Sequence, residues 1–133
     1  MSRENVDLIY RAYDALTRHD IHAALELMHP EIEATSRILE VEGAVYKGHS
    51  GMRELIEGIW SVFPNWESKV LEAREVSDDV VLATVRNRGK GAASGVEIDM
   101  TAWQVVEFRD GKPILLRPYE TEAEALEAVG LSE

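Results

Sequence analysis

The sequence predicts a single α+β domain in which three helices precede a curved antiparallel sheet. Helical spacing of apolar residues recurs in the first half of the chain, whereas residues 66–119 alternate with the period of two that strands show. The clearest alternation places one set of side chains on one face: Val96, Ile98, Met100, Ala102, Gln104, Val106 and Phe108. A length of 133 residues, 1–133, is typical of one domain with one core.

Local signals place the helices. The first helix is predicted over about residues 3–18, and Asp20 is a candidate N-cap for a second helix that Pro30 ends near His29. A short strand over residues 32–38 and a loop over 39–49 follow. The third helix runs to about Phe63, and its apolar face consists of Met52, Leu55, Ile56, Ile59, Trp60 and Phe63.

Charge pairing predicts the register of two central strands. If residues 92–95 form a hairpin loop, Lys90 faces Glu97 and Arg88 faces Asp99, so that opposite charges meet across the ladder. This register places Asn87 on the face that carries Gln104. A shift by one residue would point these charges into the core, so the pattern selects the register.

The dipeptide Asp110-Gly111 indicates a second hairpin. A two-residue loop would point Arg117 and Tyr119 inward. A three-residue loop, with Gly111 in a left-handed conformation, would instead point inward Ile114, Leu116, Pro118 and Glu120. We favour the three-residue loop, because an inward Arg117 without a carboxylate partner would be costly. Thr121 and Glu124 then form a capping box for a short C-terminal helix.

Composition narrows the class of partner. A formal net charge of −11 argues against a nucleic-acid or anionic-membrane partner, since both require clustered Lys and Arg. The absence of cysteine excludes disulfides and thiolate chemistry. No apolar run suits a signal peptide or a membrane span, so we expect a cytoplasmic protein. No set of His, Asp and Glu has the spacing of metal ligands, and we predict neither a metal nor a cofactor.

Several segments together resemble one superfamily. They are residues 12–16 leading to Asp20, residues 46–49 before the third helix, and residues 95–100, 109–112 and 124–131. The chain resembles SnoaL-like domains of the nuclear-transport-factor-2-like superfamily. The resemblance implies a cone-like barrel, in which a curved antiparallel sheet wraps around three N-terminal helices, and a short C-terminal helix. It also implies a small-molecule pocket and a homodimer, while the chemistry varies among members.

The resemblance to ketosteroid isomerase does not extend to its catalytic set. The position of the general-base aspartate falls on Ser36, that of the oxyanion-hole tyrosine on Ala12, and that of the oxyanion-hole aspartic acid on Gln104. Neither Ser36 nor Gln104 can exchange a proton as that chemistry requires. Polyketide cyclases often carry His or Asp where this chain has Gln104, which puts a cyclase-type proton shuttle in doubt.

Gln104 is the best-placed polar candidate, because an amide in an apolar stripe needs hydrogen-bond partners. It either binds a ligand or is satisfied by Asn87, Ser36 or backbone groups. Glu120 and His49 are weaker candidate bases: Glu120 lies before a helix cap, and His49 precedes a helix that it or Ser50 caps. The predicted ligand pocket comprises Tyr13, Ser36, Met52, Ile56, Trp60, Asn87, Met100, Gln104 and Pro118.

Three functions are consistent with this pattern. The first is an isomerase- or cyclase-type enzyme acting on an apolar, carbonyl-bearing metabolite. The second is a non-catalytic protein that binds a small apolar molecule in the same pocket. The third is an interaction module whose pocket is filled by Trp60 and Met100. An apolar island on the outer sheet face, which we predict as the homodimer interface, comprises Trp103, Val105 and Tyr119.

Overall fold

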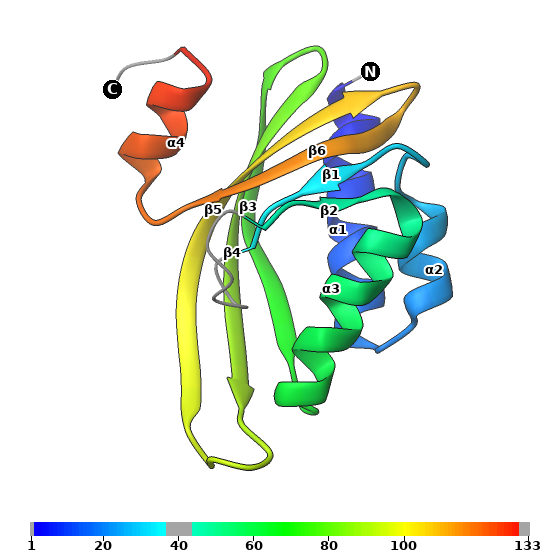
Figure 1. Ribbon diagram of the computed structural model, residues 1–133. Helices are drawn as coiled ribbons and strands as arrows, with labels where there is room; N and C mark the ends of the chain where they lie inside the picture. Colours follow the sequence, from blue (N-terminus) through cyan, green and yellow to red (C-terminus); the bar gives the residue numbers. More distant parts are fainter. Residues whose placement is uncertain (1, 37–43, 131–133) are drawn as a thin grey trace.

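The computed structural model describes residues 2–36 and 44–130 (Figure 1). The helices in these residues are α1 (Ser2–Thr17), α2 (Ile21–Glu26), α3 (Gly48–Val62) and α4 (Glu122–Ala128). The strands are β1 (Glu33–Ala34), β2 (Tyr46–Lys47), β3 (Glu67–Ser77), β4 (Val80–Lys90), β5 (Glu97–Arg109) and β6 (Lys112–Tyr119).

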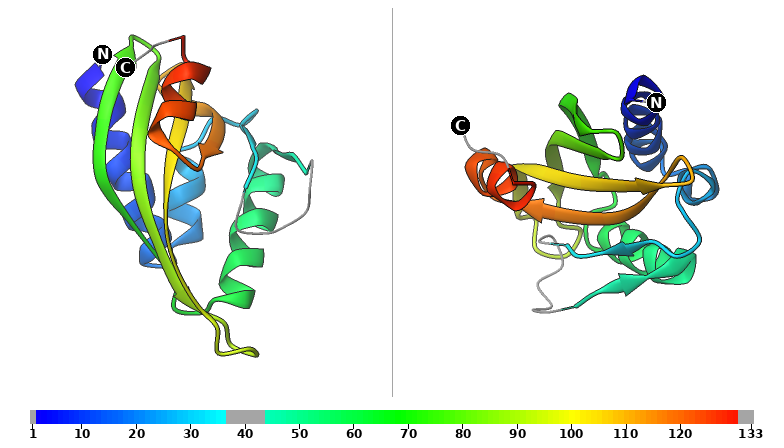
Figure 2. Two further views of the ribbon diagram at one scale, coloured as in Figure 1. Left: turned by 90° about the vertical axis from the view of Figure 1, so that its left-hand side faces the viewer. Right: turned by 90° about the horizontal axis from the view of Figure 1, so that it is seen from above.

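The strands form one sheet in the order β2-β1-β6-β5-β4-β3. All neighbours are antiparallel except β1, which runs parallel to β6 and makes the sheet mixed. The long strands curve around α1 and α3 without closing into a complete barrel, so the molecule tapers like a cone (Figure 2). The predicted α+β fold is therefore confirmed.

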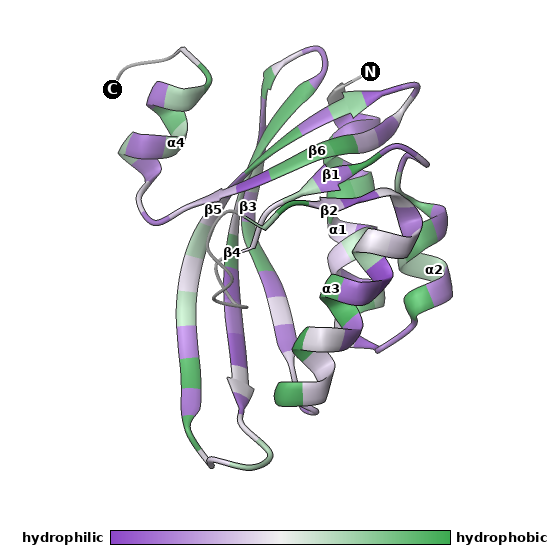
Figure 3. Cartoon of the chain, in the orientation of Figure 1, coloured by the Kyte–Doolittle hydropathy of each residue, from purple (hydrophilic) through white to green (hydrophobic). Residues whose placement is uncertain are grey.

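The central hairpin has the predicted register. Lys90 lies opposite Glu97, Arg88 opposite Asp99, and Asn87 opposite Met100. The Asp99 carboxylate, however, accepts two hydrogen bonds from the diagonal neighbour Arg86, at 2.6 and 2.8 Å. These bonds hold the pKa of Asp99 below its usual range. The alternation of apolar and polar residues that predicts this register is visible along β5 in Figure 3.

The β5–β6 hairpin corrects one prediction. Arg109 pairs with Lys112, so the loop has two residues, Asp110 and Gly111, both with positive φ. The expected three-residue loop is wrong. The inward face is nevertheless as predicted for Leu116 and Pro118, because a β-bulge adds one residue to β6 before Leu115. Arg117 consequently points outward and pairs with Glu107 at 3.1 Å.

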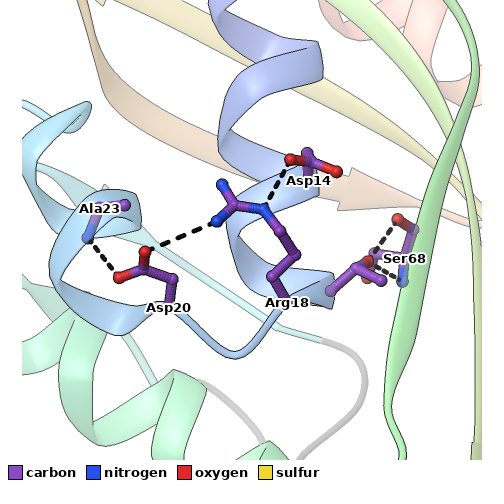
Figure 4. Close-up of polar contacts among 6 residues, drawn as sticks. Asp14, Arg18, Asp20, Ala23 and Ser68 are labelled. Atoms are coloured by element: carbon purple, nitrogen blue, oxygen red, sulfur yellow. Dashed lines mark hydrogen bonds and ion pairs between the residues drawn. The ribbon is translucent and has the colours of Figure 1, made fainter.

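Two predicted helix caps are confirmed, but the predicted cap of α3 by His49 or Ser50 is wrong. Helix α3 begins at Gly48, so both residues lie inside it, and its N-cap residue Lys47 makes no side-chain cap hydrogen bond. The Asp20 carboxylate accepts a hydrogen bond from Ala23 N at 3.1 Å, and Thr121 Oγ1 accepts one from Glu124 N at 3.1 Å. Arg18 bonds Asp14 and also lies 3.6 Å from Asp20, which joins the end of α1 to the start of α2 (Figure 4). Strand β1 is shorter than predicted, and residues 37 and 38 of the predicted strand lie outside the described residues.

Helix α4 covers part of the outer sheet face. Ala125 and Leu126 pack against Leu82 and Val105, and Val105 is only 2% exposed. The prediction that Val105 belongs to an exposed patch is therefore wrong, because the C-terminal helix folds back over it. Trp103 and Tyr119 border the same cluster and are half-buried. In Figures 1 and 2, α4 lies on the side of the sheet away from α1 and α3.

Candidate functional site

An apolar cavity of about 110 Å³ lies between the helices and the inner face of the sheet. Helices α1 and α3 form one wall, and β4, β5 and β6 form the other. Its residues are Ile9, Ala12, Tyr13, Leu16, Met28, Ala34, Thr35, Ser36, Met52, Leu55, Ile56, Ile59, Trp66, Ser68, Asn87, Met100, Ala102, Gln104, Pro113, Leu116 and Pro118. None of these lining residues is Asp, Glu, Lys, Arg or His, so the described wall carries no ionised side chain.

Gln104 carries a fully buried polar atom of this wall, Oε1, that lacks a hydrogen-bond partner among the described residues. Its neighbours on adjacent strands are Ala83 and Pro118, and Ala102 and Val106 lie two residues away on the same face. None of these four side chains can donate a hydrogen bond. Gln104 is therefore not satisfied by Asn87, one of the partners that the sequence left open.

A buried polar chain holds the Asn87 side chain through its amide oxygen. Trp66 Nε1 donates to Ser68 Oγ at 3.0 Å, and Ser68 Oγ donates to Asn87 Oδ1 at 2.7 Å. The Ser68 backbone is held separately, because its N–H donates to Thr17 Oγ1 and its carbonyl accepts from the same hydroxyl (Figure 4). The Asn87 side-chain oxygen thus accepts a hydrogen bond within this chain. Its amide nitrogen remains available as a donor at the cavity wall.

Tyr13 lies between the cavity and a surface groove at α1 and β3, and together with Ser68 it lines both. Burial raises the pKa of the Tyr13 hydroxyl far above its ordinary value, so this group is a neutral phenol at physiological pH. It can donate a hydrogen bond, but it is too weak an acid to supply a base near neutral pH.

The structure brings eight of the nine predicted pocket residues to one cavity, with Trp60 as the exception. The Trp60 ring instead stacks on His19, with centroids 4.3 Å apart and planes 7° from parallel. Trp60 therefore does not fill the pocket. Met100 does line the cavity.

The two weaker candidate bases lie outside the described cavity wall. Glu120 is exposed and follows the end of β6. His49 Nε2 lies 2.9 Å from the Met28 carbonyl oxygen, so this ring nitrogen must carry a proton and donate to that carbonyl. His49 therefore ties the start of α3 to the end of α2.

Trp66 and Ser68 are the important pocket residues that the sequence did not single out. The sequence feature that could have identified Trp66 is Gly89, which lies within β4. A Cβ added at Gly89 would lie 2.8 Å from a carbon of the Trp66 ring, so only glycine leaves room for this ring. A glycine inside a strand often marks a close approach of this kind.

A family model for the SnoaL-like domain matches residues 9–114. The chain belongs to the SnoaL-like domain family. The protein Bal32a from a soil-derived mobile gene cassette is similar in structure, with 19% identity, a TM-score of 0.81 and coverage of 96% of each chain. An NTF2-like protein from Burkholderia pseudomallei K96243 has 18% identity and a TM-score of 0.77 over 96% of this chain and 97% of its own.

The protein TerC, solved after co-crystallisation with polyporic acid, is a further structural neighbour of this SnoaL-like domain. It has 20% identity and a TM-score of 0.75, with coverage of 96% of this chain and 98% of its own. No curated protein sequence is significantly similar to the domain. At these identities the structural neighbours establish the fold.

Three lining residues stand at the positions that the sequence resemblance assigns to the ketosteroid isomerase set. They are Ala12, Ser36 and Gln104. None of the three side chains can act as a general acid or base at neutral pH. In residues 2–36 and 44–130, no helix is long and apolar enough to span a membrane, and no group of three His, Asp or Glu could hold a metal ion.

Proposed function

We propose that this SnoaL-like domain binds a small, neutral, apolar molecule in the cavity between α1, α3 and the sheet. The observation that carries the proposal is the composition of the wall, which is apolar except for a few uncharged polar groups. Ligand pockets characteristically combine apolar walls with a small number of oriented polar groups.

The charge of the ligand follows from the same wall. An ion buried without a partner costs far more than a buried neutral group. The described wall offers no opposite charge for a ligand ion, and the raised pKa of Tyr13 keeps that residue neutral. A neutral molecule is therefore the one that this cavity can accept.

The size of the cavity limits the ligand to one ring. Typical ligand pockets occupy roughly 300–1,000 Å³, whereas an engineered cavity of about 150 Å³ binds benzene. The cavity of about 110 Å³ is closer to the second value. The described residues therefore enclose space for a single-ring compound.

A cavity-filling variant tests the proposal. Ala102→Leu adds three carbons at the wall, and Ala93→Leu makes the same change in the exposed hairpin loop as a control. Toluene and phenol should raise the Tm of the wild type and of Ala93→Leu. At about 100 times Kd the stabilisation is ~2.7 kcal/mol. Ala102→Leu should lose it. Equal shifts in both variants, or no shift in the wild type, would contradict binding in this cavity.

Catalysis of isomerase or cyclase type on an apolar carbonyl compound is the second candidate. Membership of the SnoaL-like family favours it, as does the presence of Gln104 and the neutral Tyr13 hydroxyl in one cavity, where both can donate to a carbonyl. Such a reaction must move a proton next to the carbonyl. Proton–deuterium exchange at that carbon, followed by NMR with cyclohexanone, should then be faster with wild type than with Gln104→Leu. Equal rates would exclude this candidate for that substrate.

We also propose a homodimer that pairs the outer sheet faces around Trp103 and Tyr119. Both side chains are half-buried at the border of the cluster under α4, which leaves apolar surface on this face. Val105 itself contributes through the packing of α4 and not through direct contact.

A further inference from the structure

We infer that the ligand carries a hydroxyl group, which donates a hydrogen bond to Gln104 Oε1. This inference rests on the proposed function, because it names the chemical class of the molecule that the cavity binds. The polar atom of the wall that decides the ligand chemistry is a buried acceptor, Gln104 Oε1.

The wall holds hydrogen-bond donors and acceptors, since the hydroxyls of Tyr13, Thr35 and Ser36 can act as either, and one buried acceptor has no partner among the described residues. Tyr13 is a lining residue whose hydroxyl is neutral, and the amide nitrogen of Asn87 takes no part in the chain from Trp66. The acceptor whose partner is missing is Gln104 Oε1, which is buried. An apolar molecule without a donor would leave that oxygen unpaired after binding.

The surroundings of Gln104 show that the missing donor does not come from the neighbouring strands. Ala83 and Pro118 flank it across the sheet, and proline also lacks a backbone N–H. A buried polar atom without a partner is costly, and native proteins retain few of them. A bound hydroxyl would donate to this oxygen and remove the cost. A ligand with a hydroxyl should therefore bind more tightly than an analogue without one.

Selectivity for a hydroxyl-bearing ligand is strong, because binding of an analogue without the hydroxyl is penalised. A site that hydrogen-bonds a hydroxyl penalises an analogue lacking it, since the polar group of the site then stays unpaired. A wall that is apolar throughout would instead favour toluene over phenol, because the phenol hydroxyl would lose its bonds to water. The cavity is small enough for these two molecules to be matched probes.

The experiment measures the Kd of phenol, toluene and fluorobenzene by titration calorimetry or ligand-detected NMR. Toluene and fluorobenzene bracket phenol in size, and neither donates a hydrogen bond. Gln104→Met keeps the shape of the side chain and removes the acceptor. Thr101→Val, which changes an exposed residue on the outer face of the same strand, is the control.

We expect Gln104→Met to weaken phenol binding by about tenfold to a hundredfold and to leave toluene and fluorobenzene unchanged or tighter. Thr101→Val should alter none of the three. If phenol keeps its affinity in Gln104→Met, or all three probes weaken equally, the hydroxyl assignment is wrong while binding in the cavity stands. If no probe binds the wild type, the proposed function itself fails.

A measurement on the wild type alone covers the case in which Gln104→Met does not fold. In the complex with phenol, nuclear Overhauser contacts from the ortho ring protons should reach the Gln104 side-chain amide. Contacts confined to Tyr13 and Asn87 would place the hydroxyl elsewhere and overturn the assignment.

Discussion

Replacing Gln104 by methionine should stabilise the ligand-free protein, although it removes a polar group from the proposed binding site. The buried Oε1 has no partner among the described residues, and an unpaired buried acceptor costs about 1–3 kcal/mol. Methionine has a similar length and no such atom. We therefore expect a gain of about 1–2 kcal/mol in the free energy of unfolding, after allowing for the imperfect fit of the thioether.

The assay is urea unfolding at pH 7, followed by tryptophan fluorescence, with a thermal scan beside it. For a chain of this length the gain corresponds to a Tm increase of about 3–5 °C per kcal/mol. The slope against urea should stay constant, since the area exposed on unfolding barely changes.

Asn87→Leu is the matched control, because its amide lies in the same cavity wall but is already bonded. Ser68 Oγ donates to Asn87 Oδ1 at 2.7 Å, and loss of that acceptor leaves a buried hydroxyl short of a partner. We expect a loss of about 1–3 kcal/mol. A loss of stability in Gln104→Met as large as that in Asn87→Leu would show that Gln104 is satisfied in the folded state, contrary to this prediction.

Three further outcomes follow from the same structure. Ser68→Ala removes the side chain that links Trp66 to Asn87 while keeping the two backbone bonds to Thr17, so urea unfolding should show a loss of about 1–3 kcal/mol; a neutral result would contradict the buried chain. Burial raises the pKa of Tyr13, so its contribution to stability is constant below about pH 10, the pKa in the unfolded chain, and declines above it. Tyr13→Phe should therefore flatten the fall in urea midpoint between pH 8 and pH 11, and an unchanged fall would count against burial of the hydroxyl. Trp103→Glu should leave the circular dichroism spectrum intact and shift the protein toward monomer in analytical ultracentrifugation; a mutant that stays dimeric would place the interface elsewhere.

Much of the fold could be predicted because its signals are local. Asp20 and Thr121 cap their helices as predicted, since a cap depends on residues within one turn. The register of β4 and β5 followed from alternation, because a strand shifted by one residue exposes its apolar face. Gln104 stood out for the same reason, as one amide in an apolar stripe.

The tertiary structure decided the features that depend on distant segments. A bulge in β6, and not the length of the loop, turned Leu116 and Pro118 toward the cavity, and hairpin signals alone do not distinguish these two solutions. Val105 is buried because a helix some 20 residues later in the sequence folds over it. Trp60 and Trp66 are both plausible core residues by pattern, yet only Trp66 lines the cavity, since Gly89 leaves room for its ring and His19 stacks on that of Trp60. Alternation and capping are properties of neighbouring residues and can be predicted from the sequence, whereas the partner of a buried polar atom depends on which strands and helices meet around it.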